Sequence, residues 1–217
     1  MENDEKVYAI KYPVAFHTVD VAITRQIKTD APPRIGICCP SCGRIIKKVD
    51  NLDLVPPSIK CDTCELDEAE KFQFTRPELL ANVRDVHEKS YEVLLIQKKS
   101  ELDGTFWRFP GGFVDPELDD SAEHAAKREA VEEVGEFETD KPKYIGSFKI
   151  DDPRYRTSAH KIITSFFELK YMWGKEAAGD DAAKCEWKSI AELKADASLR
   201  NPIHEQLFQS LFKIYAS

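Results

Sequence analysis

Alternating apolar and polar positions predict most of the strands of this chain. The stretch 15–24 alternates and is rich in β-branched residues, which is typical of a strand. A continuous apolar run at 91–97 indicates a buried strand, and residues 107–114 are typical of a strand that enters a turn. Further strands are predicted at 144–150, 161–169 and 183–188.

A helical spacing of apolar positions predicts the remaining elements. The clearest helix runs from Asp120 to Val134, with Asp120 and Glu123 forming a start similar to a capping box and Gly135 at the C-terminal end. Shorter helical segments are predicted at 77–84 and 189–193, and a final amphipathic helix at 201–215. Because strands and helices are mixed without regular alternation, the fold class is α+β, or a mixed-sheet sandwich.

Length and composition allow one good-sized core, or one core with a small added module. Of the 217 residues, 42% are hydrophobic and 32% are charged, which is ordinary for a globular protein. The sequence contains no apolar run long enough to cross a bilayer, and its acidic start is unlike a signal peptide. We therefore expect a cytoplasmic protein with no membrane partner.

The formal net charge of −8 argues against bulk nucleic-acid binding. A duplex binder usually carries a basic stripe, because neutralising phosphates drives that association. This chain has only short basic pieces, such as Lys47-Lys48. A small anionic substrate held through a divalent metal remains compatible with the acidic composition, because the metal supplies the positive charge.

Five of the six cysteines lie between Cys38 and Cys64, in a segment where apolar periodicity is weak. Without a secretion signal, disulfides are not the expected use of such a cluster. Four of these cysteines have the spacing CxxC-x18-CxxC, which predicts a tetrahedral zinc site. The four predicted zinc ligands are Cys39, Cys42, Cys61 and Cys64. We interpret Cys38 as a bystander and the site as a structural staple; the alternative is a surface for homodimerisation or for gripping an RNA end.

Three glutamates on the long predicted helix suggest a second metal site. Glu129, Glu132 and Glu133 fall within an arc of about 100° on a helix. Like charges on one face repel one another, and a hard cation such as Mg²⁺ or Mn²⁺ would offset this repulsion. Taken alone, the pattern also fits a solvated acidic face. Two features favour metal: a Pro-Gly-Gly turn precedes the helix, and the opposite helix face is apolar. The apolar positions are Ala126, Ala130, Val131 and Val134.

The segment from Gly112 to Gly135 resembles the signature of the Nudix hydrolase family. That signature is Gly-x5-Glu-x7-Arg-Glu-U-x-Glu-Glu-x-Gly-U, where U is aliphatic, and its second half matches Arg128-Glu129-Ala-x-Glu132-Glu133-x-Gly135. The first half departs from it through a two-residue insertion, with Asp120 in place of the first glutamate. The resemblance implies an α/β/α sandwich with a mixed sheet. It places the Nudix domain at 1–27 and 68–217, with a zinc ribbon inserted at 28–67.

The resemblance also implies a catalytic centre. Glu129, Glu132 and Glu133, with the carbonyl of Gly112, are expected to hold Mg²⁺ or Mn²⁺, and Arg128 is expected to orient a carboxylate. Bound metal would activate water for attack on a diphosphate. The catalytic base is open: it is Glu132, or a downstream acid, for which a hydrophilic loop is the simpler interpretation. The downstream candidates are Glu176, Asp180 and Asp181.

Residues 144–156 are similar to a segment of ADP-ribose pyrophosphatases, in which an Asp-Pro-Arg stretch follows the strand after the signature. This similarity implies cleavage of ADP-ribose to AMP and ribose 5-phosphate. Arg154 and Arg156 are candidates to bind phosphate, and Tyr155 or Trp107 to stack on a base. The backbone of Gly111 and Gly112 can approach the substrate closely. Trp107 is equally compatible with the core, and we expect Trp187 in the core.

Two alternatives remain at this point. NADH pyrophosphatases of the same family also carry a four-cysteine zinc ribbon, so NADH, NAD or an NAD-capped RNA is the second substrate class. The Ser-Gln-Pro-Trp-Pro-Phe-Pro stretch characteristic of those enzymes is missing here. The alternative of another class is a non-catalytic ADP-ribose or nucleotide sensor, or a zinc-ribbon binding protein. All three glutamates are present, which a pure sensor would not need, and the short segment after Trp187 leaves no room for a winged helix.

Overall fold

The computed structural model describes residues 14–27, 33–56, 59–62, 64, 75–86, 89–99, 106–155, 157, 160–179 and 182–215. The chain divides into two compact units, one made of Met1–Gln26 with Tyr91–Ser217 and the other of Ile27–Ser90. Among the described helices, none combines the length and the apolar character needed to cross a membrane.

A mixed sheet forms the centre of the first unit, and seven of its strands lie in the described residues. They are β1 (Ala15–Ile27), β5 (Ser90–Lys98), β6 (Gly111–Phe113), β7 (Phe137–Thr139), β8 (Lys143–Ile150), β9 (Lys161–Gly174) and β10 (Ala182–Ser189). The order is β10-β5-β1-β9-β7, with β6 paired to β1 and β8 paired to β9. Strands β1 and β9 are parallel, with Ala15 opposite Lys161, whereas β6, β7, β8 and β10 are antiparallel to their partners.

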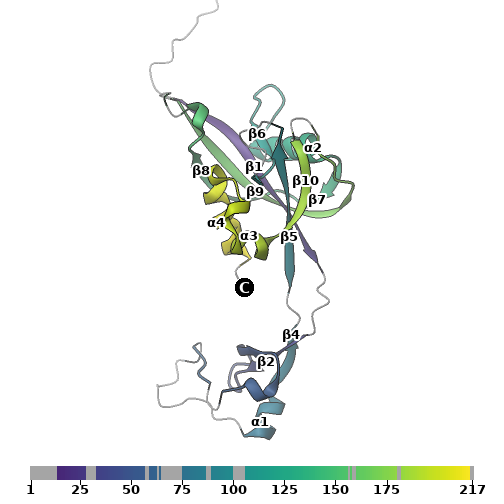
Figure 1. The fold of residues 1–217 in the computed structure, drawn as a ribbon, viewed down its shortest axis with the longest axis vertical. Helices are drawn as coiled ribbons and strands as arrows, with labels where there is room; N and C mark the ends of the chain where they lie inside the picture. Colours follow the sequence, from purple (N-terminus) through teal and green to yellow (C-terminus); the bar gives the residue numbers. More distant parts are fainter. Residues whose placement is uncertain are drawn as a thin grey trace, which may run out of the picture. The chain divides into compact units, whose positions relative to one another are not determined.

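Helices cover both faces of this sheet (Figure 1). Successive residues of a strand point to opposite sides, so a strand of consecutive apolar residues has two faces to bury. Val21 and Ile23 of β1 pack in a cluster with α2 (Ala122–Val134), whereas Ala22 between them packs in a cluster with α3 (Ile190–Ala195) and α4 (Glu205–Ile214). The predicted α/β/α sandwich with a mixed sheet is therefore confirmed.

The helix α2 buries a stripe of small side chains against the sheet. Ala125, Ala126, Ala130 and Val134 are completely buried, so the helix can approach the strands closely. The prediction that Val131 belongs to this face is wrong, because its side chain is 42% exposed. The acidic residues of α2 consequently lie beside a helix face that is fixed by packing.

The C-terminal segment begins with the short helix η4 (Pro202–His204) and continues as α4. Asn201 caps η4, because its side chain accepts a hydrogen bond from the Ile203 N–H at 2.9 Å. Leu207, Phe208 and Leu211 of α4 are completely buried. Each such side chain contributes about 1.5–3 kcal/mol when it is removed from water, so this helix is held firmly on the sheet.

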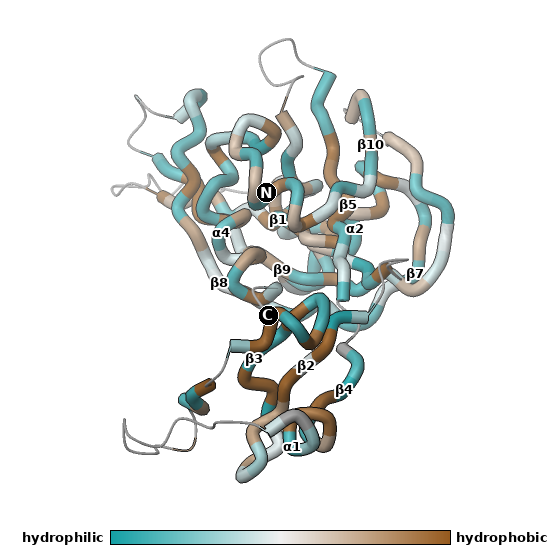
Figure 2. The backbone as a smooth tube through the Cα atoms, turned by 60° about the horizontal axis from the view of Figure 1, so that its bottom comes forward, coloured by the Kyte–Doolittle hydropathy of each residue, from teal (hydrophilic) through white to brown (hydrophobic). Residues whose placement is uncertain are grey.

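The second unit is a small antiparallel sheet with one covering helix. Its strands are β2 (Arg34–Cys38), β3 (Ile45–Val49) and β4 (Val83–Val86), in the order β3-β2-β4. The helices are η1 (Leu52–Leu54) and α1 (Arg76–Ala81). Most of β2 and β3 is coloured as hydrophobic in Figure 2. Among the described residues of this unit, an apolar cluster is formed by Ile37, Val49, Ile59 and Leu79.

Two sequence predictions differ from the structure in this region. The helix predicted at 77–84 ends at Ala81, and Val83–Val86 instead forms β4, which pairs with β2. The compact unit extends to Ser90 and is longer than the predicted module at 28–67. Pairing of β4 with β2 joins residues 83–86 to the segment that contains the cysteines. Local sequence patterns do not predict pairing between residues so far apart in the chain.

Candidate active site

The start of α2 differs from its prediction by one residue. Ser121 is the N-cap, and its hydroxyl oxygen accepts a hydrogen bond from the His124 N–H at 3.1 Å. The proposed capping role of Asp120 is therefore wrong. A serine at this position satisfies one of the free N–H groups of the first turn, so the acidic residues before it are available for other contacts.

Asp119 forms the ion pair that anchors the signature arginine. Arg128 donates from Nε to Oδ1 of Asp119 at 3.0 Å and from Nη2 to Oδ2 at 2.8 Å. The Asp119 side chain is fully buried, and the hydrogen bonds from Arg128 lower the pKa of Asp119 to about 2. The carboxylate is thus ionised at neutral pH, and it fixes the guanidinium plane in two places.

Arg128 also contacts two of the predicted metal-binding glutamates. Its Nη1 donates to Oε1 of Glu129 at 2.9 Å and to Oε2 of Glu132 at 3.0 Å, and its Nη2 donates to the Phe113 carbonyl at 3.0 Å. The orientation of a carboxylate by Arg128, expected from the sequence, is therefore seen for two carboxylates. The bidentate contact itself is made with Asp119.

Glu133 holds the Pro-Gly-Gly turn against the helix. Its Oε2 accepts from the Gly111 N–H at 2.7 Å, and its Oε1 accepts from Lys98 Nζ at 2.8 Å. Gly111 has φ +157°, and a Cβ there would lie 2.1 Å from the Val19 carbonyl oxygen. Only glycine fits this close approach between β6 and β1, so the turn has one available geometry.

Glu129 lies directly against the next glycine. A Cβ placed on Gly112 would be 2.4 Å from Oε2 of Glu129, so the missing side chain makes room for this carboxylate. The Glu129 side chain is 13% exposed, and burial raises its pKa above the ordinary value. A carboxylate removed from water in this way gains stability from a bound cation.

The three glutamates share a region but differ in their surroundings. Their oxygen atoms do not gather as a set within 4.8 Å of one another; in the described part of the chain, only the four cysteines form such a group. Arg128 connects Glu129 with Glu132, and Lys98 engages Glu133. Carboxylate oxygens beside a glycine carbonyl are nevertheless a hard donor set that suits Mg²⁺ or Mn²⁺.

Lys98, Arg128, Glu129 and Glu133 line a cavity of about 840 Å³ in the first unit, and Glu132 is not among its lining residues. One part of its wall is formed by Gly111, Gly112, Glu129 and Glu133. Positive charge is contributed by Lys98, Lys99, Arg108, Arg128 and Arg154. A cavity of this size is typical of a small-molecule site, and its mixture of acidic and basic groups suits an anionic ligand bound together with a cation.

The residues predicted to bind substrate are partly assembled around this cavity. Arg154 lines it and forms an ion pair with Asp152, with 2.7 Å between Nη2 and Oδ2. Tyr155 packs on Phe16, with 5.3 Å between ring centroids, and is not among the lining residues. Arg156 lies outside the described residues.

The base-stacking role considered for Trp107 is wrong. Its side chain is 6% exposed, belongs to the core cluster with α3 and α4, and does not line the cavity. Trp187 packs against the cluster on the α2 side, in agreement with the expected core position.

The downstream candidates for the catalytic base gain no support from the geometry. Glu176 accepts from Trp187 Nε1 at 2.5 Å and from the Tyr171 hydroxyl at 3.3 Å, and it does not line the cavity. Both contacts hold its carboxylate in a structural network. Asp180 and Asp181 lie outside the described residues.

Several polar residues of the cavity were not predicted from the sequence, among them Asp20, Lys98, Arg108 and His204. Two of them left a signal. Asp20 occupies a buried position between two valines of β1, and His204 precedes Leu207 and Phe208 on the apolar stripe of the last helical segment. A charged or polar residue in a stripe of core positions is a candidate for function.

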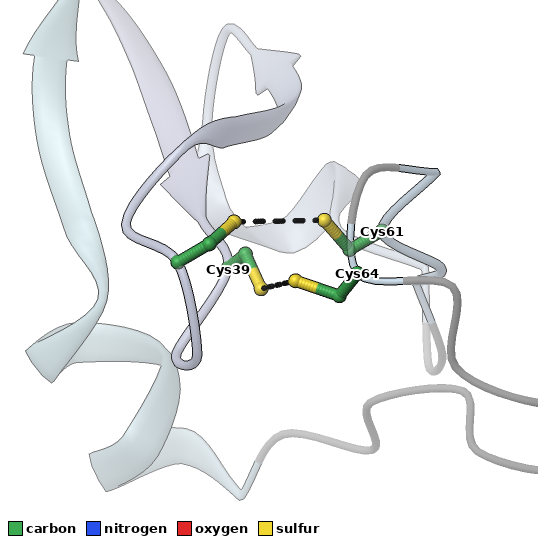
Figure 3. A group of neighbouring side chains, drawn as sticks. Cys39, Cys61 and Cys64 are labelled. Carbon is green, nitrogen blue, oxygen red and sulfur yellow. Dashed lines mark hydrogen bonds between the residues drawn. The ribbon is translucent and has the colours of Figure 1, made fainter.

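The predicted zinc ligands come together in the second unit. The sulfurs of Cys39 and Cys64 are 3.6 Å apart, those of Cys42 and Cys61 are 3.8 Å apart, and all four lie within 4.8 Å of one another. Figure 3 shows the side chains pointing toward a common centre. Zn–S bonds of about 2.3 Å in a tetrahedron place sulfurs about 3.8 Å apart, so the cluster fits zinc. Cys38 is not part of it.

Comparison with known proteins agrees with this architecture. The NUDIX domain family matches residues 74–211. An ADP-ribose pyrophosphatase of Methanocaldococcus jannaschii is 32% identical over 111 residues, which are 51% of this chain and 62% of that protein.

Solved structures show the same fold. The NUDIX domain of Shewanella oneidensis NrtR, complexed with ADP ribose, has a TM-score of 0.55 at 13% identity, with 96% of this chain and 94% of that chain covered. A MutT protein of Methanosarcina mazei Go1 has a TM-score of 0.51 at 14% identity, with 96% and 100% covered. At these sequence identities, both similarities show a shared fold and no more.

This chain therefore belongs to the Nudix family, since the family match covers more than half of its length. Within that family, the curated relative is an ADP-ribose pyrophosphatase, of which the matched region spans 62%.

Proposed function

We propose that the protein is a divalent-metal-dependent pyrophosphohydrolase that cleaves ADP-ribose to AMP and ribose 5-phosphate. The observation that carries this proposal is the packing of the largely buried Glu129 carboxylate against Gly112, in a cavity lined by basic side chains. Membership of the Nudix family and the similarity to an ADP-ribose pyrophosphatase support it. We also propose that the enzyme is cytoplasmic.

In this proposal, Glu129, Glu132 and Glu133 hold Mg²⁺ or Mn²⁺ together with the Gly112 carbonyl. When bound, the metal would lower the pKa of a water molecule and offset the negative charge of the phosphoryl oxygens. Glu133 would contribute a carboxylate oxygen to the metal; in the structure its Oε2 accepts from the Gly111 N–H and its Oε1 accepts from Lys98 Nζ. Glu132, which is 47% exposed, is the base that accepts the proton of the attacking water.

In this proposal, Arg154 at the cavity binds a phosphate of the substrate. Arg154 is on the surface, with a side chain that is 70% exposed, and its guanidinium can reach a phosphate oxygen of an entering ligand. Arg128 keeps Glu129 and Glu132 oriented through its Nη1 and does not itself need to touch substrate. Arg156 remains a proposed phosphate ligand.

A substrate panel tests the proposal. Wild-type protein with magnesium is incubated with ADP-ribose, NADH, NAD, diadenosine polyphosphates and NAD-capped RNA, and products are identified by mass spectrometry. We expect AMP and ribose 5-phosphate, with ADP-ribose giving the highest kcat/KM. Binding of ADP-ribose without turnover of any compound would instead identify a sensor.

The cysteine cluster favours one second candidate, an NADH or NAD pyrophosphatase, because those relatives also carry four zinc-binding cysteines. Its four sulfurs fit a zinc ion. A kcat/KM for NADH or NAD that exceeds the value for ADP-ribose about tenfold, a difference of about 1.4 kcal/mol, would select this candidate.

A further inference from the structure

Asp20, Arg108 and His204 line the cavity apart from the glutamates of α2 and belong to one polar network. The Thr164 hydroxyl donates to Oδ2 of Asp20 at 2.6 Å, and Oδ1 of Asp20 lies 3.6 Å from Nδ1 of His204. Nε2 of His204 lies 3.1 Å from Nη2 of Arg108. His204 is 2% exposed and Asp20 is 6% exposed. The proposed cleavage gives none of these residues a role.

Donor and acceptor chemistry fixes the direction of the hydrogen bond between Arg108 and His204 and the position of the histidine proton. A guanidinium has only donors, so Nε2 of His204 must accept the hydrogen bond from Arg108. A neutral imidazole then carries its proton on Nδ1, the nitrogen that faces the Asp20 carboxylate. Burial lowers the pKa of His204 well below its ordinary value, which keeps the ring neutral and Nε2 available as an acceptor.

The backbones at both ends of the contact are held in place. The Arg108 N–H donates to the Ile96 carbonyl and the Ile96 N–H donates to the Arg108 carbonyl, both at 3.0 Å. The His204 N–H donates to the Asn201 carbonyl at 3.0 Å, and the His204 ring stacks on Phe109 at 6.1 Å between centroids. His204 is therefore a rigid acceptor aimed at a guanidinium on the cavity wall.

We propose that Arg108 is a substrate-binding residue that donates to an anionic phosphate oxygen of the diphosphate, and that His204 and Asp20 are positioning residues that hold its guanidinium in place. A planar guanidinium suits phosphate, because it offers several donors in one plane. This proposal rests on the proposed function, since it names a further contact of the same substrate.

Replacement of His204 tests the positioning role. His204→Leu fills the space without an acceptor, whereas His204→Gln keeps an acceptor for Arg108. We measure kcat and KM for ADP-ribose with magnesium, and binding of inorganic pyrophosphate by calorimetry without added metal. Loss of a hydrogen bond to a charged group is worth about 1.5–3 kcal/mol. We therefore expect His204→Leu to weaken pyrophosphate binding and raise KM by about tenfold or more, with kcat within about threefold and with partial recovery in His204→Gln.

Arg108→Lys provides a test that does not depend on the folding of the His204 variants. Lysine keeps the charge but loses the planar donor set, so KM and the pyrophosphate Kd should again rise about tenfold. Asp20→Asn should shift both in the same direction by a smaller factor. Unchanged KM and pyrophosphate affinity in folded His204→Leu or in Arg108→Lys would overturn the proposal, as would a loss confined to kcat and thermal stability.

The measurement of pyrophosphate binding distinguishes failure of the Arg108 contact from failure of the proposed hydrolase function. Pyrophosphate binding that depends on His204, in a protein that cleaves none of the panel compounds, would support the Arg108 contact and reject the hydrolase. Cleavage of ADP-ribose with pyrophosphate binding and KM both independent of His204 and Arg108 would reject the Arg108 contact alone.

Discussion

At the scale of single residues, three glutamates on one helix have three different environments. Glu133 is 3% exposed and held by Lys98 and the Gly111 N–H, Glu129 is 13% exposed beside Gly112, and Glu132 is 47% exposed. The sequence indicated their common face, because helix geometry alone determines it. Their different burial depends on the path of the glycine turn, which no local pattern reports.

The ion pair between Asp119 and Arg128 should be essential for activity. Asp119→Asn removes the anion that fixes the guanidinium of Arg128. Arg128 then no longer holds the carboxylates of Glu129 and Glu132 in their orientations. Loss of such an orienting partner typically lowers activity about 10- to 100-fold. We expect this decrease in kcat/KM for ADP-ribose, measured against Asp120→Asn, an exposed neighbour that should stay within about twofold of wild type. Equal effects of the two substitutions would remove Asp119 from the catalytic framework.

The buried carboxyl group of Asp20 should make the free energy of unfolding depend on pH. Burial raises its pKa from 3.8 to about 6, so the folded protein keeps this proton while the unfolded chain loses it. The wild type therefore loses stability as pH rises from about 4 to about 6, by roughly 3 kcal/mol across this window. Asn at this position does not titrate. Urea unfolding without magnesium should show the stability of Asp20→Asn rising relative to wild type over the same pH range; a constant difference would contradict the raised pKa.

The choice between Asp119 and Asp120 could not be made from the sequence. They precede the N-cap Ser121 by two residues and one residue, respectively, and Asp120 matches the spacing of the family signature. The cap at Ser121 and the turn in which the Asp115 N–H donates to Asp119 place the earlier carboxylate inward. Asp119, and not the residue at the signature position, therefore contacts Arg128.

At the scale of elements, the long periodic segments were predictable and the short paired ones were not. Strand β1 and helix α2 begin within two residues of their predicted starts, because each buries a regular stripe. Strand β9 extends to Gly174, beyond its predicted end at 169, because β7 pairs with its last residues. Such pairing joins residues far apart in the chain and leaves no local periodicity.

The junction between β6 and α2 gives a prediction about Gly112. In Gly112→Ala, the new Cβ would meet the Glu129 carboxylate at 2.4–2.6 Å, so that carboxylate must move. The clash falls on the end of a flexible side chain, and the thermal midpoint should change by only a few degrees. We expect kcat for ADP-ribose to fall about tenfold or more. Gly146→Ala, whose Cβ meets only the Phe148 ring at 3.2 Å, is the matched control and should retain activity.

At the scale of the whole molecule, the two units differ in how their folds are stabilised. The first unit has two large apolar clusters, one on each side of the sheet, whereas the described residues of the second unit form one cluster with four buried apolar residues. A core that small cannot supply the stability of a folded domain. The cysteine spacing predicts that zinc stabilises this unit, and the sequence patterns placed the end of the predicted module at residue 67, before α1 and β4.

Loss of zinc should therefore unfold the second unit selectively. Cys61→Ser removes one ligand of the four-sulfur set, and metal binding contributes on the order of 10 kcal/mol to folding in such sites. We expect loss of bound zinc by elemental analysis, and loss of hydrogen-exchange protection at the paired strands β2, β3 and β4. Cys38→Ser, which changes a cysteine outside the set, should keep both. Full protection in zinc-free Cys61→Ser would show that the apolar residues suffice.

The central claim is that carboxylates of α2 make the cavity a metal-dependent centre for cleavage of a diphosphate. The most direct test compares Glu132→Gln with Glu123→Gln, an exposed glutamate on the same helix, in steady-state hydrolysis of ADP-ribose with magnesium. We predict that Glu132→Gln loses about 100- to 1000-fold in kcat while its thermal midpoint is unchanged, and that Glu123→Gln behaves as wild type. A folded Glu132→Gln protein with the kcat of Glu123→Gln would contradict the account.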